Sequence, residues 1–99
     1  MIVKLTEGFV VWLTNLKDER ARARIVARLD RLAMGNLGDV KPVGQGMSEM
    51  RIDYGPGYRV YFVQRGDALI VVLAGGNKKS QSKDIELALK AAANLETVE

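Results

Sequence analysis

Four basic residues in the second half of the chain have the spacing needed to gather around one phosphate. Arg51 and Arg59 lie on either side of a Gly-Pro-Gly turn signal at residues 55–57, and Lys78 and Lys79 follow a later apolar run. Guanidinium groups pair with two phosphate oxygens at once, whereas ammonium groups act as point charges. The pattern favours a site that binds a phosphodiester and stabilises the negative charge that develops when such a bond is cleaved.

The same side chains also have ordinary structural roles open to them. Arg59 could pair with Asp53 across a hairpin, and Arg51 with Glu49 or with a group on a neighbouring strand. Lysines in a loop, such as Lys78 and Lys79, are usually solvated. The residue pattern alone leaves both interpretations open.

Other residues could assist such a site. Glu49 is a conceivable general base if it lies beside Arg51. Tyr61 could stack on a nucleobase from the polar face of its strand. Lys41 and Lys83 extend the positive charge, and we predict that they contact RNA.

Missing residue types narrow the chemistry. The chain has no histidine and no cysteine, which removes the commonest general acid–base group, thiolate nucleophiles and disulfides. It also lacks a GK[ST] phosphate loop and a GxGxxG fingerprint. We therefore expect no metal and no cofactor, and any catalysis must use Arg, Lys, Tyr, Asp or Glu.

Positive charge is unevenly distributed along the chain, whose net charge is +3. Residues 41–83 carry seven basic and three acidic residues, which gives +4, and residues 84–99 carry one basic and four acidic residues, which gives −3. This concentration suits a polyanionic partner, although a solvated surface would show the same pattern.

Length and composition predict one small domain over residues 1–99. A chain of 99 residues, 47% of them hydrophobic, can bury one modest core. The longest apolar runs are far shorter than the ~20 residues that a membrane-spanning helix needs. The first residues lack the basic and apolar regions of a secretory signal. We expect a cytoplasmic protein that has no contact with a membrane.

The first half of the chain predicts a strand followed by two helices. Residues 2–6 form the strand, and apolar residues at helical spacing over 9–16 indicate the first helix. Asp18 is the expected N-cap of the second helix, which ends at Gly35. The short connection predicts an antiparallel helical hairpin. Residues 35–47 are expected to form a long surface loop.

The second half predicts three consecutive strands and a helix. Alternating apolar residues indicate strands at 49–54 and 58–64, and an apolar run indicates a third at 68–74. Residues 75–80 read as a flexible basic loop, and the final helix begins near Ser82. The fold class is therefore α+β, with helices packed on a mostly antiparallel, twisted sheet.

The hairpin between the first two of these strands can be given a register. If Tyr54 faces Tyr58 across the turn, Ile52 lies opposite Val60 and Met50 opposite Phe62, all toward the core. The same register gathers four residues on the other face, namely Arg51, Asp53, Arg59 and Tyr61.

Several segments resemble a known family. They are Phe9-Val10-Val11-Trp12-Leu13, Ser48-Glu49-Met50-Arg51-Ile52, Gly55-Pro56-Gly57-Tyr58-Arg59-Val60-Tyr61-Phe62 and Leu73-Ala74-Gly75-Gly76-Asn77-Lys78-Lys79-Ser80-Gln81. The likeness covers roughly residues 9–92, nearly the whole chain. In this pattern the chain resembles the phage Gp49-like, HigB-like branch of the RelE/ParE toxin superfamily.

This resemblance implies a RelE-like fold and the toxin of a type II toxin–antitoxin pair. It also implies an mRNA interferase, an endoribonuclease that cuts messenger RNA on the ribosome. The implied partner is a small antitoxin, of the helix-turn-helix type, through which alone the toxin would meet operator DNA. By position, Arg59 takes the place of a phosphate-stabilising arginine, Arg51 that of a basic residue on the preceding strand, and Lys78 or Lys79 that of a basic residue after the last strand.

One departure from the family keeps the function open. Relatives that cleave RNA often carry a tyrosine or histidine near the C-terminus, where this chain has Asp84 and Ile85. The groups that would transfer protons are therefore not identified. Two alternatives remain: a ParE-like DNA gyrase poison that acts by binding, and a catalytically degenerate toxin that only binds its antitoxin.

Overall fold

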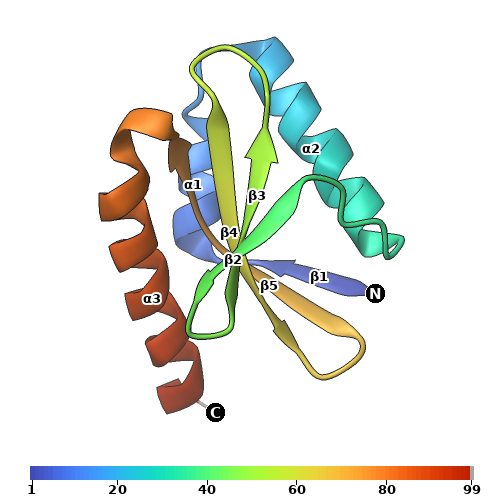
Figure 1. Cartoon of the computed structure of the whole chain (residues 1–99), viewed down its shortest axis with the longest axis vertical. Helices are drawn as coiled ribbons and strands as arrows, with labels where there is room; N and C mark the ends of the chain where they lie inside the picture. Colours follow the sequence, from blue (N-terminus) through green and yellow to red (C-terminus); the bar gives the residue numbers. More distant parts are fainter. Residues whose placement is uncertain (99) are drawn as a thin grey trace.

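The computed structural model describes residues 1–98, with side chains described up to residue 95. The chain folds as the α+β domain that the sequence predicts (Figure 1). In chain order the elements are β1 (Ile2–Leu5), α1 (Glu7–Thr14), α2 (Glu19–Ala33), β2 (Val40–Gly44), β3 (Met47–Ile52), β4 (Tyr58–Arg65), β5 (Leu69–Asn77), a 3₁₀ helix η1 (Lys78–Ser80) and α3 (Gln81–Val98).

Over these residues a five-stranded sheet separates two layers of helix. Its strand order is β1-β5-β4-β3-β2, with β1 parallel to β5 and the other neighbours antiparallel. Helices α1 and α2 pack on one face, and α3 packs on the other (Figure 1). The predicted, mostly antiparallel sheet is confirmed. No helix of the described chain has the length and apolar character needed to cross a bilayer.

Local capping explains where the first helices begin and end. The Thr6 hydroxyl accepts a hydrogen bond from the Phe9 amide at 3.2 Å, so α1 begins at Glu7. The helix ends at Thr14, short of the predicted end at residue 16. The Asp18 carboxylate accepts from two amides of the first turn of α2, which confirms the predicted N-cap. The C-cap of α2 is Met34, one residue before the predicted Gly35, and Gly35 follows it with a φ of 87°, the left-handed conformation that commonly ends a helix.

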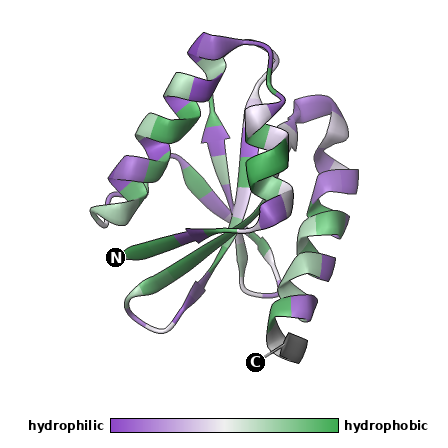
Figure 2. Cartoon of the chain, turned by 180° about the vertical axis from the view of Figure 1, so that it is seen from behind, coloured by the Kyte–Doolittle hydropathy of each residue, from purple (hydrophilic) through white to green (hydrophobic). Residues whose placement is uncertain are grey.

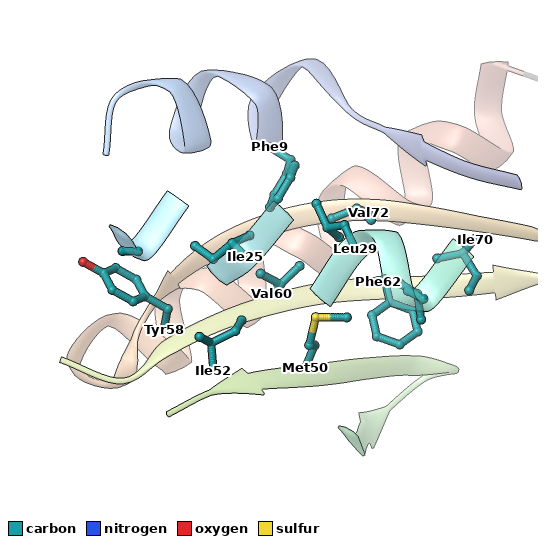
Figure 3. Packing of buried hydrophobic residues seen from close by; sticks show 12 residues of the cluster. Phe9, Ile25, Leu29, Met50, Ile52, Tyr58, Val60, Phe62, Ile70 and Val72 are labelled. Atoms are coloured by element: carbon teal, nitrogen blue, oxygen red, sulfur yellow. The ribbon is translucent and has the colours of Figure 1, made fainter. Parts of the chain in front are cut away.

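The larger core lies between the sheet and helices α1 and α2 (Figure 3). Phe9 and Ile25 descend from the helices onto Met50, Val60 and other side chains of the central strands. All four of these residues are fully buried. The helices are accordingly striped with hydrophobic and hydrophilic residues (Figure 2).

A second core lies under α3. Its buried residues come mainly from β3, β4 and β5, and Ala88 is the fully buried residue that α3 contributes. The predicted stripe of Ile85, Leu89 and Ala92 packs against this core, and Leu95 extends it. Because several of these side chains are small, α3 buries less apolar surface per residue than a leucine-rich helix would.

The predicted loop at residues 35–47 contains a strand instead. Strand β2 pairs with β3 at the edge of the sheet, and the pairing is irregular between Pro42 and Gly44. Proline lacks an amide hydrogen and is tolerated on an edge strand, where one side of the backbone needs no partner. Because this short segment contains proline and glycine, its sequence has the pattern of a loop and does not predict a strand.

The predicted hairpin register is wrong by two residues. Ile52 pairs with Tyr58 and Met50 with Val60, so the connection covers residues 53–57 and Tyr54 lies outside the strand. A shift of two residues leaves each side chain on its predicted face. It does, however, place Arg51 directly opposite Arg59.

Gly75 and Gly76 belong to β5, although the sequence predicts them in a flexible loop. A Cβ on Gly75 would collide with the Trp12 ring of α1, and one on Gly76 with the Asp84 carboxylate of α3. These glycines therefore let a helix approach the strand on each face. Close packing explains them, and flexibility does not.

Candidate active site

The centre of the candidate site is the pair Arg51 and Arg59, which face each other across β3 and β4. Like charges in directly opposed positions of a sheet destabilise it. This destabilisation is offset because each arginine has an acidic partner of its own. Both guanidinium groups border the same surface cavity.

Arg51 is held by Asp39, a residue just before β2 that the sequence analysis did not select. Its Nη2 and Nε donate to Asp39 Oδ1 at 2.8 and 3.2 Å. The hydrogen bond from Arg51 lowers the pKa of the Asp39 carboxyl below its ordinary value, and the carboxylate in turn raises the pKa of Arg51. Of the two alternatives for Arg51, the contact with a neighbouring segment is the one the structure shows.

Asp39 is positioned by Arg28 of α2. The Arg28 Nη1 donates to the Arg51 carbonyl oxygen at 2.7 Å, and Nη2 donates to the carbonyl oxygens of Leu37 and Asp39 at 3.3 and 3.4 Å. Desolvation of its partly buried guanidinium lowers the pKa of Arg28. A Cβ at Gly38, whose φ is 67°, would lie 2.9 Å from this guanidinium. Arg28 thus ties helix, loop and strand together beneath the Arg51–Asp39 pair.

Arg59 is paired with Glu49, and not with Asp53, which the sequence offers as an alternative partner. Its Nη1 lies 3.5 Å from Glu49 Oε1, while the side-chain Nε2 of Gln81, at the start of α3, donates to Glu49 Oε2 at 2.7 Å. Glu49 is fully buried, and the Arg59 side chain is 15% exposed. The Arg59 Nε is buried without a hydrogen-bond partner, so this guanidinium keeps unused donor capacity.

The predicted roles of Glu49 and Tyr61 change, because helix α3 covers both side chains. Glu49 does not lie at the surface beside Arg51, so it positions Arg59 and cannot reach a large substrate directly. Tyr61 is fully buried under α3 and cannot stack on a base. Burial, reinforced by the negative charge of Glu49, raises the pKa of Tyr61 well above its ordinary value.

Lys78 completes a cluster of three cations. It lies in η1, where the Asn77 side chain accepts from the Lys79 and Ser80 amides at 2.9 and 3.1 Å. The turn before β4 packs close by, because a Cβ on Gly57 would lie 3.6 Å from the Lys78 Cβ. The turn before β4 and the Asn77 cap therefore hold the backbone of Lys78 beside the two arginines.

These cations line a surface cavity of about 330 Å³. Its charged lining residues are three basic and two acidic side chains, namely Arg51, Arg59, Lys78, Asp39 and Asp53. Asp39 is occupied by Arg51, whereas Asp53 is exposed. The cavity can receive an anion, and Lys78 and Asp53 are groups on its wall that can exchange protons.

The three remaining predicted site residues lie outside this cavity. Lys79 is exposed on η1, Lys83 is exposed on the first turn of α3, and Lys41 is exposed on β2, where its register partner is Glu49. The catalytic role of Lys79 and the contact of Lys41 and Lys83 with RNA stay predictions. Within residues 1–98, no cluster of acidic residues has the form of a metal site.

Comparison with known proteins places the chain in a family. Residues 11–95 match the family described as phage derived protein Gp49-like (DUF891). The chain is 47% identical over 93 residues to an uncharacterized protein of Haemophilus influenzae, a match that covers 94% of each chain.

A solved structure shares the fold. It is a mutant of the E. coli toxin RelE in its free state, which superposes with a TM-score of 0.64 at 13% identity and covers 86% of this chain and 94% of that chain. At this low identity the likeness shows the fold alone. The sequence match and the shared architecture agree with the features described above, and the chain is a member of the phage-derived Gp49-like family with the RelE fold.

Proposed function

We propose that the chain is the toxin of a type II toxin–antitoxin pair and that it cleaves messenger RNA on the ribosome, in the cytoplasm. The observation that carries this proposal is the convergence of Arg51, Arg59 and Lys78 on one cavity. Membership of the Gp49-like family and the RelE fold support it, since the solved neighbour is described as a toxin. The proposed inhibitor is a cognate antitoxin.

Cleavage without a metal requires attack by the ribose 2′-hydroxyl on the adjacent phosphorus. A bond forms from the 2′ oxygen to phosphorus, the bond from phosphorus to the 5′ oxygen breaks, and one proton leaves the nucleophile while another joins the leaving group. The five-coordinate intermediate carries extra negative charge. Arg51 and Arg59 stabilise this charge, because arginine stays protonated and presents several donors.

We assign the proton transfers to Lys78 and Asp53 on the cavity wall, because Asp39, the other carboxylate there, is bonded to Arg51. Glu49 acts indirectly by holding the Arg59 guanidinium, to which it is the buried partner. Because the cavity holds so few acid–base groups, we infer that ribosomal RNA completes the positioning of the substrate.

The test is messenger cleavage in a reconstituted translation system, mapped by primer extension. Arg51→Ala should reduce the cleavage rate by about 10²–10³-fold, as loss of one charge-stabilising donor does in other enzymes. Arg59→Lys keeps a cation beside Glu49 but loses the forked donors of the guanidinium, so we again expect a large loss of cleavage rate. Arg20→Ala, which removes an exposed arginine outside the cavity, is the matched control.

Messenger that stays intact in the presence of ribosomes and wild-type protein would overturn the proposal. Trapped gyrase–DNA complexes would instead identify a gyrase poison, and neither effect would identify a protein that only binds its antitoxin. The same protein should cleave naked RNA poorly. Efficient cleavage without ribosomes would contradict the inferred role of ribosomal RNA.

A further inference from the structure

A second basic surface, whose arginines the cleavage mechanism does not use, adjoins the candidate active site. We define the α2 groove as the recess of about 180 Å³ between α2 and the end of β3. Its lining residues are Arg24, Ala27, Arg28 and Arg31 from the helix and Ile52 and Asp53 from the strand end. Ile52 and Asp53 also line the active-site cavity, so the two recesses share a wall.

The arginines of this groove are costly to the helix that carries them. Arg24, Arg28 and Arg31 are spaced by four and three residues, and like charges at these spacings destabilise a helix by about 0.2–0.5 kcal/mol per pair. The charge of Arg31 is one of the causes that lower the pKa of Arg28. The stability of the helix by itself therefore does not favour three cations on one face of α2.

Of the three groove arginines, Arg28 is the one whose guanidinium donates hydrogen bonds within the fold of the described chain. It donates to backbone carbonyl oxygens, as described above. Arg24 lies over the Tyr54 ring at 4.6 Å from the centroid, a cation–π contact that orients the guanidinium, and it forms no ion pair within the described part of the chain. Arg31 forms no ion pair among residues 1–98 and is exposed. Asp53 is the one carboxylate in the groove lining.

We propose that the α2 groove binds the sugar-phosphate backbone of single-stranded RNA that continues out of the active-site cavity. Arg24 and Arg31 are seven residues apart, which is about 10 Å along a helix, so they can contact different phosphates. The shared wall formed by Ile52 and Asp53 lets one strand run from the cavity into the groove. A recess favours a single strand over the wide backbone of a duplex. This inference rests on the proposed function but concerns binding and not cleavage.

The test measures binding of a short fluorescent 2′-O-methyl oligouridine to the purified full chain by anisotropy, over a series of salt concentrations. The methyl groups block attack by the 2′ oxygen, so binding is separated from cleavage. Arg24→Ala/Arg31→Ala should weaken binding about 10- to 100-fold at low salt. It should also reduce the steepness of the salt dependence by about 1.4, because each phosphate contact contributes about 0.7 for single strands.

The matched control is Lys17→Ala/Arg20→Ala, which removes the same charge from exposed positions outside the groove. This control should retain most of the affinity. Asp53→Asn should bind the RNA more tightly, because it removes the carboxylate from the groove wall. Two double variants with equal affinities would show that only net charge matters, and would overturn the proposal.

Two further outcomes decide the occupant. Duplex DNA that competes as well as the oligouridine would contradict a single-strand groove. If Arg24→Ala/Arg31→Ala keeps its RNA affinity but loses affinity for poly-L-glutamate, the groove takes an acidic protein segment and the proposal is wrong. Failure of messenger cleavage, in contrast, would leave a positive binding result standing, so the two proposals fail separately.

Discussion

The two faces of the β3–β4 pair use the same backbone for opposite purposes. Met50 and Val60 face α1 and α2 and are fully buried in the larger core. On the other face, Glu49 is buried under the start of α3, whereas Arg51 and Arg59 border the cavity. The difference lies in how far each face is covered by helix. The side chains that helices cover stabilise the fold, and the proposed chemistry occurs where the sheet is no longer covered by a helix.

The largest contrast between the faces should appear in stability. Phe62 is 3% exposed in the larger core, and Phe62→Ala should lower the free energy of unfolding by about 3–5 kcal/mol, because burial is lost and a cavity remains. Arg51→Ala removes an exposed ion pair and should leave the denaturation midpoint nearly unchanged. Urea denaturation followed by circular dichroism measures both.

Equal destabilisation by these two substitutions would contradict the division of labour between the faces. Val63→Ala provides a control within the second core, where Val63 is 2% exposed. It removes fewer atoms than Phe62→Ala and should cost less.

A smaller loss should follow when the buried ion pair is broken. Arg59→Ala leaves the Glu49 carboxylate buried without its cation, while the Gln81 side-chain amide still donates to it. An uncompensated buried charge costs about 3 kcal/mol. A loss of activity in this variant would therefore reflect both its lower stability and the absence of the Arg59 cation.

Glu49→Gln/Arg59→Ala separates the two effects. The neutral amide at position 49 should restore most of the stability lost in Arg59→Ala, while messenger cleavage stays impaired because the cation is still absent. A double-mutant cycle in the free energy of unfolding measures the coupling. A coupling near zero would show that Glu49 does not hold Arg59 in solution. Recovery of cleavage in the double variant would remove Arg59 from the proposed chemistry.

The parts of the fold that depend on local rules were predictable. Asp18 as an N-cap, Gly35 after the second helix and the alternation of β3 and β4 need only a few neighbouring residues for their recognition. The register error shows the limit of the pattern. A period of two fixes the face of each side chain but not its partner, so the sequence places Arg51 and Arg59 on one face without showing that they lie directly opposite each other.

The surroundings of the site depend on contacts between distant segments. Asp39 reaches Arg51 because Arg28 holds the chain between α2 and β2, and no local pattern announces that contact. Glu49 and Tyr61 alternate with apolar neighbours as exposed residues would, yet α3 covers them. Where a covering helix begins is a property of the tertiary structure, so the sequence identified the arginines and misjudged their partners.

The smallest expected effect compares two buried tyrosines, one on each face. Burial raises the pKa of both Tyr58, in the larger core, and Tyr61, under α3, and the shift is larger for Tyr61. The unfolded chain ionises its tyrosines at about pH 10, while the folded chain keeps these two protonated to higher pH. Their contribution to stability is therefore complete below pH 10 and is lost as the pH rises above it, by at most about 1.4 kcal/mol per pH unit for each group.

Tyr61→Phe should flatten the fall in unfolding free energy between pH 10 and pH 11, measured by urea denaturation at each pH. Tyr58→Phe should flatten it over a narrower range. If Tyr61→Phe keeps the full alkaline slope of the wild type, Tyr61 ionises as readily in the folded chain as in the unfolded one, and α3 does not seal this face in solution.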